Sequence, residues 1–143
     1  MKIAIGSDHA GFYLKEDIKK YLEEKNIKVV DKGPESADRV DYPDYGHAVG
    51  HEVIDNNLDY GIVICGSGIG ISIAANKVKG IRAALVSEPY SAKLARRHNN
   101  ANVIAMGARL IGLDMAKEIV DAFLNEDFEG GRHINRVEKI EEE

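Results

Sequence analysis

The chain has 143 residues, a length that suits a single domain, and its 44% hydrophobic residues are enough to build a core. Its 19 Lys and Arg against 24 Asp and Glu give a net charge of −5, which argues against a general binder of nucleic acid. One cysteine excludes an internal disulfide framework and a multi-cysteine zinc site. No apolar run approaches the ~18 residues of a membrane span, and no leader pattern follows Met1. We therefore expect a cytoplasmic protein that binds neither membrane nor nucleic acid.

Short apolar runs alternate with helical patterns along the chain. The runs predicted to be strands are 3–5, 27–30, 61–65, 81–86 and 102–106. The helices predicted between and after them cover 10–26, a segment from 42–44 onward, a segment that runs through 73–75, 90–97 and 112–125. In the second helix Val49, Val53 and Ile54 are the expected buried stripe, and in the last one Met115, Ile119, Val120 and Phe123. This alternation predicts an α/β fold, a three-layer α/β/α sandwich of Rossmann-like type around a five-stranded parallel sheet.

The C-terminal segment departs from this repeat. Gly130-Gly131 should stop a helix, and 132–136 should form a second short helix with Arg132 and Arg136 on one face. No strand is left for this helix to pack behind. We therefore expect one domain over 1–143, in which 128–143 is an arm that contacts a neighbouring subunit of a homo-oligomer.

The residues with chemical potential follow three of the predicted strands. They are 6–9 after the first strand, 65–70 after the third and 107–109 after the fifth. Because ligands of open α/β sheets bind at the carboxyl ends of the strands, these segments mark the expected site. His98 and Asn99 are an exception, since they precede the fifth strand.

The turn after the third strand has glycines at 66, 68 and 70, directly before a predicted helix. Its backbone N–H groups can converge on one negative group, reinforced by the helix N-terminus. The turn is not a P-loop. It is not a dinucleotide-binding G-x-G-x-x-G either, because Ile71 occupies the place of the third glycine. Glu88 lies where such a fold keeps its ribose acid, so a nucleotide- or sugar-phosphate-binding module without catalysis stays open as an alternative.

Several side chains around this edge suit acid/base chemistry on a phosphorylated substrate. Cys65 ends a strand beside a helix N-terminus, where a thiolate is stabilised and reactive. Asp8, His9 and His98 can move protons near neutral pH, and Arg109, Arg132 and Arg136 can hold a phosphate. His47 and His51 have the spacing of a metal pair, but no other Cys/His cluster completes it, so we expect no metal.

Six segments together resemble the type B ribose-5-phosphate isomerases, whose wider family includes subunits of galactose-6-phosphate isomerase and allose-6-phosphate isomerase. The segments are 6–11, 41–45, 65–77, 80–84, 98–102 and 130–133. The resemblance spans nearly the whole chain in order. It implies a three-layer sandwich around five parallel strands, assembled as homodimers or dimers of dimers with active sites shared between subunits, and no cofactor.

The resemblance also implies roles for individual residues. Cys65 matches the base that moves a proton between C1 and C2 of the sugar; a second branch of the family uses a glutamate where this chain has Ile71. Ser67 matches a residue that assists the thiolate, and His98 matches the ring-opening histidine, with Asp8 as its counterpart. The substrate-binding positions that match are His9, Tyr42, Gly66, Gly68, Ile69, Gly70, Asn99, Arg109, Arg132 and Arg136.

The expected function is therefore interconversion of D-ribose 5-phosphate and D-ribulose 5-phosphate through ring opening and a cis-enediolate, in the non-oxidative branch of the pentose phosphate pathway. A hexose-6-phosphate isomerase acting on allose or galactose 6-phosphate is the alternative within the same family. The sequence does not separate the two, because the depth of the pocket cannot be read from it.

Overall fold

The computed structural model describes residues 1–143, in which strands and helices alternate as the periodicity predicts. The strands are β1 (Lys2–Ser7), β2 (Lys28–Asp31), β3 (Tyr60–Cys65), β4 (Ala83–Leu85) and β5 (Val103–Gly107). The helices are α1 (Phe12–Glu24), α2 (Tyr42–Asp55), α3 (Ile69–Asn76), α4 (Pro89–Asn99), α5 (Leu113–Leu124) and α6 (Arg132–Glu141).

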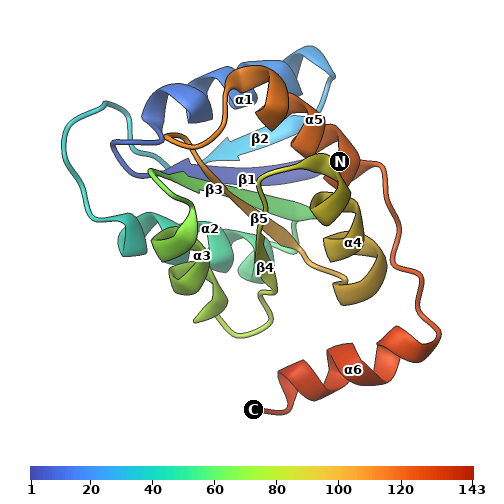
Figure 1. Cartoon of the computed structure of the whole chain (residues 1–143). Helices are drawn as coiled ribbons and strands as arrows, with labels where there is room; N and C mark the ends of the chain where they lie inside the picture. Colours follow the sequence, from blue (N-terminus) through green and yellow to red (C-terminus); the bar gives the residue numbers. More distant parts are fainter.

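The five strands form one fully parallel sheet in the order β2-β1-β3-β5-β4 (Figure 1). β3 lies at the centre and every residue from Gly61 to Cys65 is buried, as its unbroken apolar run predicts. Its C-terminal residues pair with Ser7 on one side and Gly107 on the other, through Ile64 and Cys65 respectively. The ends of three strands therefore meet at one edge of the sheet.

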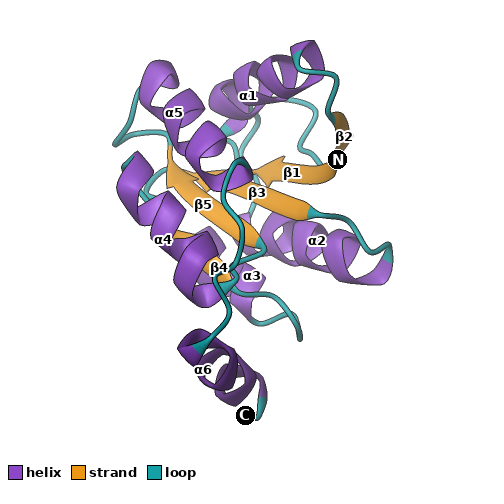
Figure 2. Ribbon diagram, turned by 90° about the vertical axis from the view of Figure 1, so that its right-hand side faces the viewer, coloured by secondary structure: helices purple, strands orange, loops and turns teal.

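Helices cover both faces of this sheet (Figure 2). Because side chains alternate across a strand, Ile3, Ile5 and Ile62 join the core with α1, α4 and α5. Ala4, Val63 and Cys65 point to the other face and pack with α2 and α3. The predicted three-layer α/β/α sandwich is confirmed, and Cys65 belongs to its α2/α3 side.

Two expectations about buried helix faces are wrong. Ile54 is 40% exposed, because α2 packs through the stripe Gly46, Val49, Gly50 and Val53 and Ile54 lies beside it. Gly46 permits this close packing, since a Cβ there would stand 2.9 Å from the Cβ of Ala74. Met115 is 38% exposed because the buried face of α5 is instead Ala116, Ile119, Val120 and Phe123.

Element boundaries also differ from expectation in ways that matter for function. β4 is shorter than the predicted 81–86, and α4 extends to Asn99, so His98 and Asn99 lie in its last turn. α6 is longer than the predicted 132–136 and lies outside the three layers (Figure 1). None of the helices combines the length and the apolar character that crossing a bilayer requires.

Candidate active site

The strands β1 and β3 are neighbours in the sheet, although the chain first leaves β1 toward β2 on the opposite side. This reversal of strand order is the topological switch point at which α/β sheets open a ligand crevice. The backbone N–H of Asp8 donates to the carbonyl of Ile64 over 3.1 Å, which holds Asp8 beside the end of β3. Asp8 and Cys65 therefore lie at the ends of adjacent strands, where such a crevice is expected.

Cys65 is buried, with 5% of the residue exposed. The backbone N–H of Gly68 donates to Sγ over 3.1 Å, and α3 begins immediately after. Both place partial positive charge beside the sulfur. Ser67 makes no hydrogen bond with Sγ; its hydroxyl accepts the N–H of Ile69 at 3.2 Å.

The turn itself offers several unpaired donors. The backbone N–H groups of Gly66, Ser67, Gly70 and Ile71 have no acceptor within the chain. Gly68 bends the chain through a left-handed conformation with φ of 78°, and a Cβ there would stand 2.6 Å from Leu85 Cδ1. The result is a set of backbone donors around the crevice, the anion-binding geometry that the glycine spacing predicts.

Two side chains border this turn from other elements. The Arg109 side chain lies over Gly66, because a Cβ built on Gly66 would be 3.0 Å from Nη1 of Arg109. The backbone N–H of Arg109 also donates to the Gly66 carbonyl at 3.0 Å. The ring of Tyr42, at the start of α2, lies against Gly70, because a Cβ built on Gly70 would be 2.6 Å from this ring. The glycines at 66 and 70 thus make room for a guanidinium and an aromatic ring at the crevice.

Asp8 and His9 are held by their own neighbours. Asp8 is 7% exposed, and its Oδ1 accepts the N–H of Gly11 at 3.0 Å. His9 Nδ1 lies 3.2 Å from the carbonyl oxygen and 3.3 Å from the backbone nitrogen of Val40. Its Nε2 has no partner in the chain, so it is the ring atom available to a ligand.

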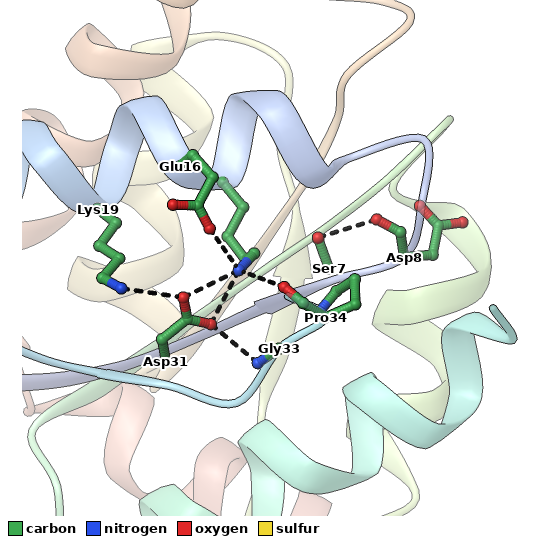
Figure 3. A network of polar contacts seen from close by, with 8 residues as sticks. Ser7, Asp8, Glu16, Lys19, Asp31, Gly33 and Pro34 are labelled. Atoms are coloured by element: carbon green, nitrogen blue, oxygen red, sulfur yellow. Dashed lines mark hydrogen bonds and ion pairs between the residues drawn. The ribbon is translucent and has the colours of Figure 1, made fainter. Parts of the chain in front are cut away.

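A buried lysine, Lys15, stabilises the loop beside this edge of the sheet. Its role was not predicted from the sequence. The Lys15 side chain is fully buried, and its ammonium donates to Glu16, to both carboxylate oxygens of Asp31 and to the Pro34 carbonyl, each at 2.9 Å (Figure 3). Neighbouring Gly33 accepts the N–H of Ser7 at 3.0 Å, directly before Asp8. The signal was a lysine on the apolar stripe of α1, in register with Ile18 and Leu22.

The remaining predicted residues lie elsewhere. His98 and Asn99 end α4, which leads into the N-terminal end of β5, whereas Cys65 pairs with Gly107 at the C-terminal end. The strand between those ends spans on the order of 13 Å. Arg132 and Arg136 are exposed on α6, beyond the end of α4 (Figure 1). Within one chain the expectation that His98 shares a sheet edge with the thiol is therefore wrong.

His98 is part of a compact cluster with His133 and Glu129. The two rings stack with centroids 4.4 Å apart and planes 14° apart, and one nitrogen or oxygen from each of the three residues lies within 4.8 Å of the others. Because the rings are nearly parallel, their lone pairs point side by side and do not converge on one ion. Burial, and the charge of His98 and Arg132, lower the pKa of His133 below its usual 6.5.

The structure shows no ligand-binding arrangement at Glu88 or at the pair His47 and His51. Glu88 caps α4, because its carboxylate accepts the N–H groups of Tyr90 at 2.7 Å and Ser91 at 2.9 Å. The Ser91 side chain and these backbone N–H groups lower the pKa of Glu88. The backbone bonds also occupy the oxygens that a ribose would need. His47 and His51 lie exposed on α2, and His51 faces Asp55 at 3.7 Å. Neither histidine belongs to a three-residue ligand cluster.

A cavity of 720 Å³ is lined by only one of the predicted site residues, Asn99. It lies between α6 and the connection from α3 to β4, and is lined by Arg82, Asn99, Ile140 and Glu141 among others. Cys65 and Asp8 are absent from its walls. The cavity lies between α6 and the rest of the chain, which α6 contacts through few groups. One of these contacts is the ion pair between the Glu141 carboxylate and the Arg82 guanidinium, 2.7 Å apart.

The sequence model of the ribose/galactose isomerases matches residues 3–140. The chain belongs to the ribose/galactose isomerase family. Among relatives of this family member, the ribose-5-phosphate isomerase B of Escherichia coli is 55% identical over 97% of this chain and 93% of its own. The D-erythrulose-4-phosphate isomerase of Pectobacterium atrosepticum is 47% identical over 98% of this chain and 93% of its own.

Solved structures agree with this family assignment. Ribose-5-phosphate isomerase B of Clostridium thermocellum matches with a TM-score of 0.98 and 52% identity, covering 99% of this chain and 96% of the other. The Mycoplasma genitalium enzyme with bound ribulose-5-phosphate matches with a TM-score of 0.94 and 46% identity, over 98% and 93%. The fold of this ribose/galactose isomerase is therefore shared over its full length.

Proposed function

We propose that this member of the ribose/galactose isomerase family interconverts D-ribose 5-phosphate and D-ribulose 5-phosphate. The observation that carries the proposal is the Cys65 sulfur, which lies at the switch point beside Asp8 and receives the Gly68 N–H. The names of the relatives in E. coli and M. genitalium support the substrate. A thiol base suits a reducing compartment, so we place the enzyme in the cytoplasm.

The proposed site is completed by a second copy of the chain. One copy supplies Asp8, His9, Cys65, the glycine turn and Arg109, and the other supplies His98, Asn99, Arg132 and Arg136. A symmetric homodimer repeats this exchange and forms two equivalent sites. Exposed Ile69 and Ile73 on α3, next to the turn, and Ile134 on α6 offer apolar surface for this contact.

The chemistry begins with the closed sugar. His98 of the second copy gives a proton to the ring oxygen O4 as the C1–O4 bond breaks, and Asp8 takes the proton of the C1 hydroxyl. An open-chain aldehyde results. His9 and the arginines hold the phosphate away from the reacting end, which positions that end through binding energy.

Isomerisation then moves one proton between neighbouring carbons. The Cys65 thiolate takes the proton from C2, the electrons form the C1=C2 bond of the enediolate, and the thiol returns the proton to C1. The proton of the C2 hydroxyl passes to O1 in the same step, so that C2 becomes the carbonyl of the ketose and C1 carries the hydroxyl. The unpaired N–H groups of the turn stabilise the enediolate oxygens, and Ser67 and Tyr42 line the wall. Oriented donors of this kind contribute on the order of 10²–10³-fold each, and a general base on the order of 10²–10⁴-fold.

The deciding experiment measures formation of ribulose 5-phosphate from ribose 5-phosphate without added metal. We expect activity in the wild type and a loss of at least about a hundredfold in kcat for Cys65→Ala. Binding of the substrate phosphate should persist in the variant, since His9 and the arginines hold it away from the thiol. Near-normal turnover by Cys65→Ala would exclude the thiol as the base, and a wild type inactive on this sugar would overturn the proposed function.

The sugar preference needs its own comparison. A panel of kcat/KM values for ribose 5-phosphate, allose 6-phosphate, galactose 6-phosphate and erythrose 4-phosphate separates the candidates. Erythrose 4-phosphate belongs in the panel because the Pectobacterium atrosepticum relative is named for erythrulose 4-phosphate, the corresponding ketose. We expect the highest value for ribose 5-phosphate; a higher value for a hexose phosphate would assign the enzyme to the hexose branch.

A further inference from the structure

The ring of His98 is supported by two residues that the proposed function leaves without a role. His133 is 6% exposed and stacks on His98, with centroids 4.4 Å apart. One carboxylate oxygen of Glu129 lies 3.8 Å from His98 Nε2, and the other lies 3.6 Å from His133 Nε2. Resting on the proposed function, we propose that His133 and Glu129 are positioning residues that fix the ring and the proton of His98 for furanose opening.

The backbone around this trio is fixed from two sides. His98 lies in the last turn of α4, whereas His133 lies in the first turn of α6. The segment between α5 and α6 is fastened to α4, because the N–H of Glu129 donates to the Arg97 carbonyl at 3.0 Å. Arg97 in turn holds the Glu126 carboxylate with two bonds of 2.8 and 3.0 Å. The partners of His98 are therefore held by a second set of contacts, as precise positioning requires.

The charges around the trio disfavour a proton on His133. Two stacked imidazoles repel each other when both are protonated, and Arg132 and Arg136 add positive charge on the α6 side. Burial, together with the charges of His98 and these arginines, lowers the pKa of His133 below its usual range. The stacked ring of His133 and the Glu129 oxygen 3.8 Å from His98 Nε2 fix the orientation of the His98 ring. The other ring nitrogen of His98, Nδ1, has no partner within the chain and is the atom that can face the substrate.

Sugar chemistry separates this role from a general structural one. Ribose 5-phosphate closes a furanose ring through O4, so its turnover includes ring opening. In erythrose 4-phosphate that oxygen carries the phosphate, so no furanose can form. Both sugars need Cys65 and the enediolate donors, but only the first needs His98. The ratio of their kcat/KM values therefore isolates the step that His133 and Glu129 serve.

The test uses the full-length protein with Glu129→Gln and His133→Phe, which keeps a ring to stack. Glu138→Gln, an exposed carboxylate elsewhere on α6, is the matched control. We expect Glu129→Gln to lower kcat/KM for ribose 5-phosphate by about tenfold or more and to leave erythrose 4-phosphate within about twofold. His133→Phe should cost less than His133→Ala.

The outcomes are distinct. Equal losses on both sugars would show a role in folding or assembly and overturn the inference, as would an unchanged kcat/KM for ribose 5-phosphate in Glu129→Gln. Since Glu129 is exposed, that variant stays informative where His133→Ala fails to fold. A wild type inactive on both sugars would overturn the proposed function itself, which is a different result from an active wild type with unselective variants.

Discussion

At the scale of single residues, the position of the Cys65 sulfur depends on one glycine. Gly68 adopts φ of 78° and brings its N–H to 3.1 Å from the sulfur, at the point where α3 begins. The space beside it is closed, because a Cβ would stand 2.6 Å from Leu85 Cδ1 and 2.8 Å from the Met106 carbonyl carbon. Any side chain at this position must move the backbone of the turn.

Gly68→Ala should therefore damage catalysis more than it damages folding. We expect kcat to fall by on the order of 10²–10³-fold, the effect of losing an oriented donor. The measurement is steady-state kinetics on ribose 5-phosphate, with circular dichroism to follow the fold. Gly112→Ala is the control, because it has nothing within 4 Å of a new Cβ and a φ of −88°. Equal kcat values for the two variants would contradict the argument.

At the scale of elements, the buried ammonium of Lys15 joins α1 to the end of β2 and the turn after it. Its contacts with Asp31 and the Pro34 carbonyl fix that turn (Figure 3). The Gly33 carbonyl of the same turn accepts the N–H of Ser7. A charge buried in this way is costly to leave without its partner. The stability of α1 and the geometry of the crevice are thus linked through one ion pair.

Lys15→Met should destabilise the protein by about 3–5 kcal/mol, the usual effect of removing one partner of a buried pair. Urea denaturation followed by circular dichroism measures this free energy of unfolding. The double variant Lys15→Met/Asp31→Asn should recover part of it, because the half-buried charge of Asp31 is removed together with the ammonium that compensates it. A loss below about 1 kcal/mol in the single variant would show that the pair contributes no more than an exposed one.

Asp31 should also contribute to acid sensitivity. Burial alone would raise its pKa, but hydrogen bonds from Lys15, the Gly33 N–H and Lys19 outweigh burial and lower it below 3.8. A carboxylate with a lowered pKa stabilises the fold above its unfolded value, and that contribution disappears as the pH falls through the folded value. Below about pH 4 the wild type should therefore lose stability more steeply than Asp31→Asn.

Denaturant melts at pH 7, 4 and 3 measure this difference. Asp127→Asn is the control, because Asp127 is exposed and forms no ion pair. Its curve should follow that of the wild type. Parallel curves for wild type and Asp31→Asn would remove Asp31 as a source of the acid sensitivity.

The elements were largely predictable, and the exceptions have physical causes. Alternating strands and helices, and the buried run at Gly61 to Cys65, identified the sheet because parallel strands are covered on both faces. Ile54 and Met115 were misplaced because periodicity shows a stripe but not its centre, which close packing at Gly46 decides. Asp31 and Pro34, which bind the Lys15 ammonium, are 16 and 19 residues away from it in sequence, beyond the reach of local patterns.

At the scale of the whole molecule, the predicted site residues fall into two groups. One surrounds Cys65 at the C-terminal edge of the sheet, and the other surrounds His98 at the junction of α4 and α6. Sequence placed the first group correctly, because each member follows a strand that ends at that edge. It could not place the second, because neither the length of α4 nor the position of the arm follows from periodicity.

Mixing two defective variants tests whether the groups meet between subunits. Cys65→Ala and His98→Asn should each be impaired on ribose 5-phosphate as separate proteins. Refolded together at equal amounts, they should regain about a quarter of the wild-type activity, because half of the dimers are mixed and each has one intact site. Activity no higher than the average of the two variants would show that both residues serve a site within one chain.

In the proposed dimer, the arm formed by α6 makes catalysis depend on the protein concentration. This helix carries Arg132 and Arg136 and lies outside the three layers (Figure 2). In the proposed arrangement an isolated subunit holds two half-sites and no whole one. Specific activity should then fall on dilution below the dissociation constant of the dimer, and saturating sugar phosphate, which binds only across the contact, should draw subunits together.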